Sequence, residues 1–94
     1  TYMTTAARLV AQAAYALKAG DSASLQHAAH TLKSSSANLG AIELSRRFGA
    51  LERHARTGAL EAARTEWSET QLEYELVVKA LQDIVAADEA VVTH

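Results

Sequence analysis

The sequence of 94 residues contains no cysteine, no proline and only four glycines. Without cysteine, the chain can form no disulfide, no thiolate zinc site and no cysteine nucleophile. Without proline, and with so little glycine, helices can continue over long stretches before they meet a residue that disfavours them. The four glycines are Gly20, Gly40, Gly49 and Gly58. Three of them separate apolar-periodic segments, so this scarcity favours an all-α protein.

Neither sign of charge is in large excess, because 9 lysines and arginines accompany 11 aspartates and glutamates, for a formal net charge of −2. This balance gives no reason to expect nucleic acid or an anionic membrane as a partner. No apolar run approaches the roughly 20 residues of a membrane-spanning helix, and the N-terminus lacks a signal-peptide pattern. We therefore expect a cytoplasmic protein without direct membrane contact.

The residues that are present predict one small helical domain, residues 1–94, and we expect it to be a monomer. Hydrophobic residues make up 49% and charged residues 21%, as in ordinary globular domains. Helices are predicted at about residues 3–19, 22–39, 42–56 and 59–86, followed by a tail at residues 88–94 that has no pattern and that we expect to fray. Very short connections join them, so consecutive helices should pack antiparallel. The prediction is an up-down-up-down four-helix bundle.

Apolar residues recur three and four positions apart in each predicted helix. In segment 3–19 they are Met3, Ala6, Val10, Ala13 and Leu17; in segment 42–56 they are Leu44, Phe48, Leu51 and Ala55. The longest series is in segment 59–86, with Leu60, Ala63, Trp67, Thr70, Tyr74, Val77, Leu81 and Ile84. At 1.5 Å per residue this helix is roughly 40 Å long and should extend beyond its partners. Gly49 is interior to segment 42–56, where close approach of a neighbouring helix would compensate its low helix propensity.

The candidate functional residue is His30, in segment 22–39. Leu25, Leu32 and Leu39 repeat every seven residues and should face the core. His30 lies roughly 150° from the centre of that stripe and should therefore point into solvent. The residues that share its outer face are Gln26, Lys33, Ser34 and Ala37.

An exposed histidine is most often a solvated polar residue, but it can also bind metal or act as a nucleophile. Lys33 could balance the charge of a phosphoryl group on His30, and the small Ser34 and Ala37 would let another protein approach closely. For a metal site, His27 and His30 provide only two ligands. His54 is expected to be solvated.

The string His30-Thr-Leu-Lys33-Ser-Ser-Ser-Ala-Asn-Leu39-Gly40-Ala41, with Leu51-Glu52 and Thr57-Gly58 after it, resembles the signature of histidine phosphotransfer (HPt) domains. The resemblance implies a four-helix phosphoryl carrier without kinase activity of its own. Such a domain takes a phosphoryl group from an aspartate of one response-regulator receiver domain and passes it to another. No glycine-rich nucleotide motif is present, so self-phosphorylation from ATP is not expected.

The resemblance also implies roles for individual residues. His30 matches the phosphoacceptor, which attacks through Nε2, and Lys33 matches a lysine that supports the phosphoryl charge. Ser34 departs from the glycine that most members have there. Glu52 occupies the position at which some members have a glutamine that bonds the imidazole Nδ1–H. The predicted docking residues for the partner are Gln26, His27, Ser34 and Ala37.

No cofactor is expected on this domain, and Mg²⁺ is expected on the partner receiver domain. Because the chain does not begin with methionine, we expect a fragment of a longer protein. The resemblance implies the C-terminal part of a hybrid sensor histidine kinase, and such a parent can be membrane-bound. Two series of charged side chains follow: Arg46, Arg47, Arg53 and Arg56 are basic, and Glu61, Glu66, Glu69, Glu73 and Glu75 are acidic. They are either solvated helix faces or a rim that attracts a receiver domain. The alternative functions are a non-catalytic bundle that binds a receiver domain or a partner helix, and a metal-binding bundle.

Overall fold

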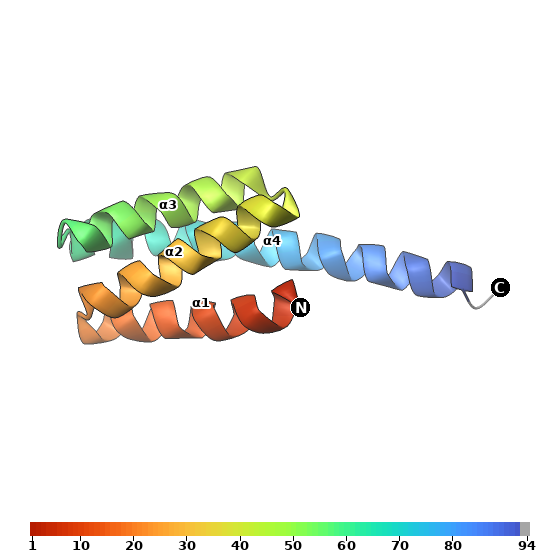
Figure 1. The fold of residues 1–94 in the computed structure, drawn as a ribbon, viewed down its shortest axis with the longest axis horizontal. Coiled ribbons are helices and arrows are strands. Elements are labelled where there is room, and N and C mark those ends of the chain that lie inside the picture. The colour runs from red at the N-terminus through yellow and green to blue at the C-terminus, as the bar shows by residue number, and fades with distance from the viewer. Residues whose placement is uncertain (93–94) are drawn as a thin grey trace.

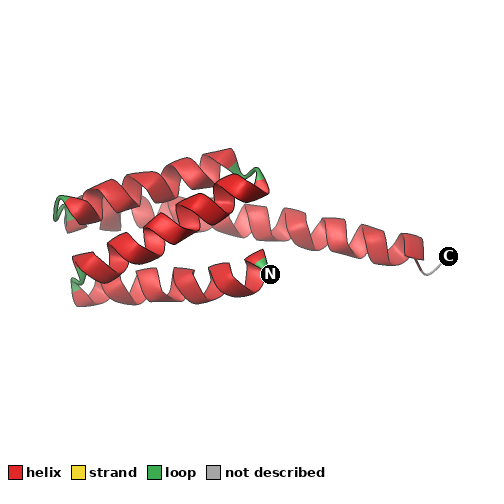
Figure 2. Cartoon of the chain, in the orientation of Figure 1, coloured by secondary structure: helices red, strands yellow, loops and turns green. Residues whose placement is uncertain are grey.

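The computed structural model describes residues 1–92, with side chains for residues 1–87, and contains four helices (Figure 1). These helices are α1 (Tyr2–Ala19), α2 (Ser22–Leu39), α3 (Ile42–Arg56) and α4 (Leu60–Val92). Within the described part of the chain there is no β-strand (Figure 2). The predicted all-α fold class is confirmed.

Tight turns join the helices and reverse the chain each time. Gly20 and Gly40 follow α1 and α2 with φ angles of 73° and 92°, a left-handed conformation in which glycine avoids the steric cost of a Cβ atom. Asp21 then caps α2, because its carboxylate accepts a hydrogen bond from the backbone N–H of Ser24 at 3.1 Å. Each turn therefore places the next helix antiparallel to the one before it.

Consecutive helices pack against one another, and α1 also contacts α4, which closes the bundle. Helix α4 extends well beyond the other three (Figure 1), and the molecule measures 53 × 20 × 19 Å. The predicted bundle with a long fourth helix is confirmed. None of the helices within the described residues combines the length and hydrophobicity needed to cross a bilayer.

The prediction of a frayed tail at residues 88–94 is wrong for residues 88–92, because α4 continues to Val92. No glycine or proline follows Gly58, so no residue in that stretch interrupts the helical backbone. Residues 93–94 lie outside the described residues.

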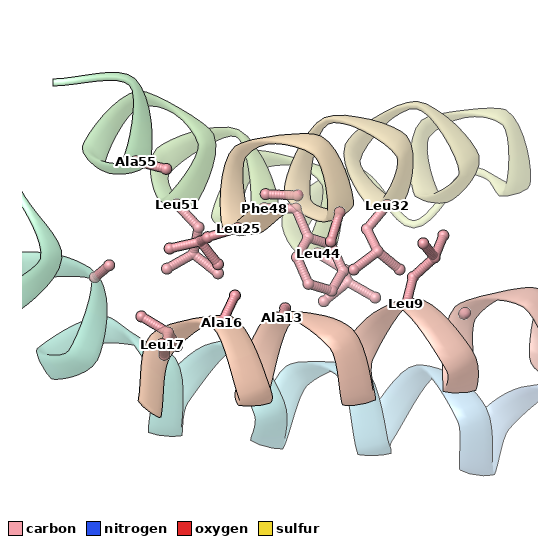
Figure 3. Packing of buried hydrophobic residues seen from close by; sticks show 14 residues of the cluster. Leu9, Ala13, Ala16, Leu17, Leu25, Leu32, Leu44, Phe48, Leu51 and Ala55 are labelled. Atoms are coloured by element: carbon pink, nitrogen blue, oxygen red, sulfur yellow. The ribbon is translucent and has the colours of Figure 1, made fainter. Parts of the chain in front are cut away.

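The core is formed by apolar side chains from all four helices (Figure 3). The predicted stripe of α3 is entirely buried, as are Leu25 and Leu32 of α2. In α1 the prediction was incomplete, because Leu9 and Ala16 are also buried while Met3 and Val10 are only partly buried. Helix α1 contacts both α2 and α4, so it buries a wider stripe than a single seam.

Two residues predicted to lie in apolar seams are exposed. Leu39 is 38% exposed because it is the last residue of α2, next to the turn at Gly40. Ile84 is 58% exposed although it continues the apolar series of α4, in the C-terminal part of that long helix.

Candidate functional site

The site lies where α2 packs against α3. His30 projects from the outer face of α2, and its side chain is 60% exposed, as the helical pattern predicted. Glu52 belongs to α3, 22 residues later, and its side chain is only 9% exposed. The packing of these two helices places Nδ1 of His30 2.6 Å from Oε2 of Glu52. Tertiary packing thus brings together two residues whose contact the sequence left undecided.

The ionisation of Glu52 determines which nitrogen of His30 carries the proton. The hydrogen bond from Lys33 is the main reason why the pKa of the Glu52 carboxyl lies below its usual value, and the bond with His30 lowers it further. Burial acts in the opposite direction but does not prevail. An ionised carboxylate only accepts hydrogen bonds, so Nδ1 of His30 must donate. In the neutral ring, Nε2 then has the free lone pair.

Lys33 reaches the site through the same carboxylate. Its Nζ lies 2.7 Å from Oε1 of Glu52, and its side chain is 39% exposed. Glu52 therefore bridges the two residues, with one oxygen for each. The ammonium has three N–H groups, of which this bond uses one. Lys33 is thus held beside His30 and keeps donors for an incoming anion.

The stem of Lys33 lies against Gly49 of α3. A Cβ atom at position 49 would lie 3.1 Å from Cδ of Lys33, closer than ordinary van der Waals contact. The close approach predicted for this glycine does occur, and the approaching group is the Lys33 side chain of α2. Sequence reasoning did not connect Gly49 with Lys33. The available signal was the presence of glycine inside a helix, where it is energetically unfavourable.

The predicted docking residues lie around His30. Gln26, His27, His30 and Glu52 line an open groove together with Ala23. Farther along α2, Ser34 and Ala37 are exposed. The Ser34 hydroxyl donates to the backbone oxygen of His30 at 3.3 Å, so it is turned onto its own helix. The Ser34 side chain therefore does not project from the surface beside the imidazole.

A comparison with protein-family models decides the relationship of this chain, because the model described as the Hpt domain matches residues 1–87. The chain belongs to the Hpt domain family. No significant match was found to a curated protein or to a solved structure. Hpt domains act in histidine phosphotransfer within phosphorelays and interact with receiver domains. The family membership predicted from the motif around His30 is confirmed.

The charged faces of α3 and α4 in this Hpt domain are partly paired with each other. Nε2 of His54 lies 2.6 Å from Oε2 of Glu66, and the His54 side chain is 28% exposed, so the prediction of a solvated histidine is wrong. Arg47 likewise pairs with Glu69 at 3.2 Å. Antiparallel packing of the two helices brings the basic and acidic series together, which the sequence positions alone did not show.

A metal site in this Hpt domain would need more ligands than His27 and His30. The portion of the chain that the structure describes contains no group of three histidine, aspartate or glutamate side chains placed to hold a metal ion. Glu52 lies close to His30, but its two oxygens already accept hydrogen bonds from His30 and Lys33. The described residues therefore place no uncommitted third ligand beside these two histidines.

Proposed function

We propose that this Hpt domain carries a phosphoryl group on Nε2 of His30, which it accepts from a receiver-domain aspartate and passes to a second receiver domain. The observation that supports this proposal is the hydrogen bond of 2.6 Å between Nδ1 of His30 and Glu52. It occupies one ring nitrogen and leaves the other free on a mostly exposed ring. A nucleophile in that state can meet a phosphoryl group that another protein presents.

In the proposed step, the lone pair of Nε2 forms an N–P bond while the P–O bond to the receiver aspartate breaks. The aspartate leaves as a carboxylate, and the proton on Nδ1 stays in place. The ring becomes positively charged next to the Glu52 carboxylate, which stabilises that charge. The reverse of the same step, with the aspartate of another receiver domain, returns the domain to its starting state.

Lys33 has an electrostatic role in this proposal. A phosphoryl group on His30 brings negative charge close to Glu52, and the Lys33 ammonium is the cation that faces this carboxylate. Phosphoryl transfer depends mostly on positioning and charge neutralisation, so the domain needs few other groups. The partner receiver domain is expected to provide Mg²⁺.

The proposal also assigns Gln26, His27, Ser34 and Ala37 to the surface that the receiver domain covers. They surround the exposed imidazole on one face of α2, which is the face that a donor aspartate must approach. We also propose that the domain is monomeric and cytoplasmic, and that it is part of a hybrid sensor histidine kinase.

The test is incubation with a phosphorylated receiver domain, followed by measurement of acid-labile, base-stable phosphate on the Hpt domain. We expect the parent protein to accept phosphate and His30→Gln to accept none. His54→Gln is the matched control, because it removes a histidine from another face of the bundle, and we expect it still to accept phosphate. Circular dichroism checks that both variants are folded. Equal phosphate on His30→Gln and the parent would refute the assignment, and binding of the receiver without any phosphate on the parent would indicate a non-catalytic binding bundle.

A further inference from the structure

Neither the helix propensity nor the backbone conformation at position 49 accounts for the glycine found there. It lies inside α3, where glycine costs about 1 kcal/mol relative to alanine. Its backbone does not require glycine, because the positive φ angles among the described residues are confined to Gly20, Gly40 and Gly58. The reason must therefore be found in what lies next to its Cα atom.

The neighbour is the side chain of Lys33. A Cβ atom at position 49 would meet Cδ of Lys33 at 3.1 Å and Cγ at 3.8 Å, and it would meet Nη1 of Arg53 at 3.7 Å. Of these contacts, the first is closer than the usual separation of about 3.5–4.0 Å between carbon atoms. The lysine stem thus passes over α3 at the one place where no side chain rises from that helix.

We infer that Gly49 is a positioning residue for Lys33 in the phosphotransfer reaction, an inference that rests on the proposed function. With no Cβ at position 49, the lysine stem lies flat against α3 and its ammonium meets Oε1 of Glu52. The other oxygen of that carboxylate holds His30, so the position of the stem determines where the cation lies relative to the phosphoryl acceptor.

A methyl group at position 49 would act on Lys33 rather than on the fold. The close contact involves a long, flexible and partly exposed side chain, which can move aside by a few tenths of an ångström at little cost. Helix propensity meanwhile favours alanine over glycine by about 1 kcal/mol. Gly49→Ala should therefore be as stable as the parent or more stable, while its lysine is displaced. A purely structural role predicts the opposite, a loss of stability.

The experiment is a double-mutant cycle with Gly49→Ala, Lys33→Ala and the combined variant. The transfer rate from a phosphorylated receiver domain is measured for each, with thermal unfolding as the check on the fold. We expect Gly49→Ala to lower the rate on the order of three- to tenfold without lowering the melting temperature. In the Lys33→Ala background, we expect the same change at position 49 to have no effect on the rate. An equal loss in both backgrounds would overturn the inference.

A second measurement does not depend on transfer. Carbon-13 NMR follows the titration of the Glu52 carboxyl, whose pKa is lowered mainly by the bond from Lys33. In Gly49→Ala we expect this pKa to move up toward that of Lys33→Ala. An unchanged titration together with an unchanged rate would show that Gly49 does not position Lys33. If the parent accepts no phosphate, the proposed function fails, and the effect of Gly49 on transfer fails with it. The titration then decides separately whether Gly49 positions the Lys33 side chain.

Discussion

Replacing Glu52 by glutamine is the most informative perturbation of the site, because it changes two hydrogen bonds and almost no volume. The carboxylate accepts from Nδ1 of His30 at 2.6 Å and from Nζ of Lys33 at 2.7 Å. A glutamine side chain has only one oxygen, and its other end is an NH₂ donor. It can accept from one of the two partners but not from both.

Either orientation of the amide impairs the site. If the oxygen accepts from Lys33, the NH₂ group faces Nδ1 and favours the tautomer with the proton on Nε2, which lacks the attacking lone pair. If the oxygen accepts from His30, the NH₂ group faces the Lys33 ammonium and displaces it. We therefore expect transfer to be about tenfold slower, which corresponds to about 1.4 kcal/mol in the barrier.

The expected loss of stability follows from the same contacts. A hydrogen bond to a charged group contributes about 1.5–3 kcal/mol. The His30 and Lys33 side chains are 60% and 39% exposed, so solvent screening places the loss at the low end or below it. In a domain of this size, about 1 kcal/mol corresponds to about 4–8 °C in melting temperature. We expect a decrease of about that size for Glu52→Gln.

Thermal unfolding, initial transfer rates and nitrogen-15 NMR of the imidazole test this prediction. Glu43→Gln is the matched control, because it removes the same charge from the same helix, and its carboxylate, with a side chain 43% exposed against 9% for Glu52, pairs with Arg46 and Arg47 at the surface. Exposed pairs contribute about 0–1 kcal/mol, so the control should unfold and transfer much like the parent. If Glu52→Gln matched the control in both measurements, or if the parent ring carried its proton on Nε2, our account of the site would be wrong.

Two further predictions concern the neighbours of His30 and the effect of acid. Ser34→Gly removes a hydroxyl that donates a hydrogen bond to the His30 carbonyl. We expect faster transfer or transfer to a wider range of receiver domains, at a cost of about 0.5 kcal/mol in helix propensity. Transfer kinetics with several receiver domains measure this, and kinetics identical to those of the parent with all of them would show that the serine is neutral. For acid, the folded-state pKa of Glu52 lies below its usual 4.5, so the folded state binds fewer protons there than the unfolded state. The stabilisation is therefore fully present above that usual value and is lost as the pH falls through the lowered pKa. Denaturant unfolding at a series of pH values should show a shallower acid-induced loss for Glu52→Gln than for the parent, and parallel curves would contradict this assignment.

Local patterns were sufficient for the helices and for the family. The three-and-four spacing of apolar residues predicted four helices, and the predicted stripe of α3 is buried as a whole. The patterns did not predict burial correctly where it depends on the packing of other helices. Leu39 and Ile84 continue their apolar series, yet both are exposed: Leu39 is the last residue of α2, and Ile84 lies in the C-terminal part of α4.

The same limit applies to the site. The sequence alone determined that His30 points outward, because helical geometry depends only on spacing along the chain, and the motif around it identified the family. Only the tertiary structure decided that Glu52 bridges His30 and Lys33, that Gly49 makes room for the lysine stem, and that His54 is paired with Glu66. These contacts join different helices, so they depend on how α2, α3 and α4 pack and on the direction of each side chain across the interface, which no periodicity within a single helix specifies.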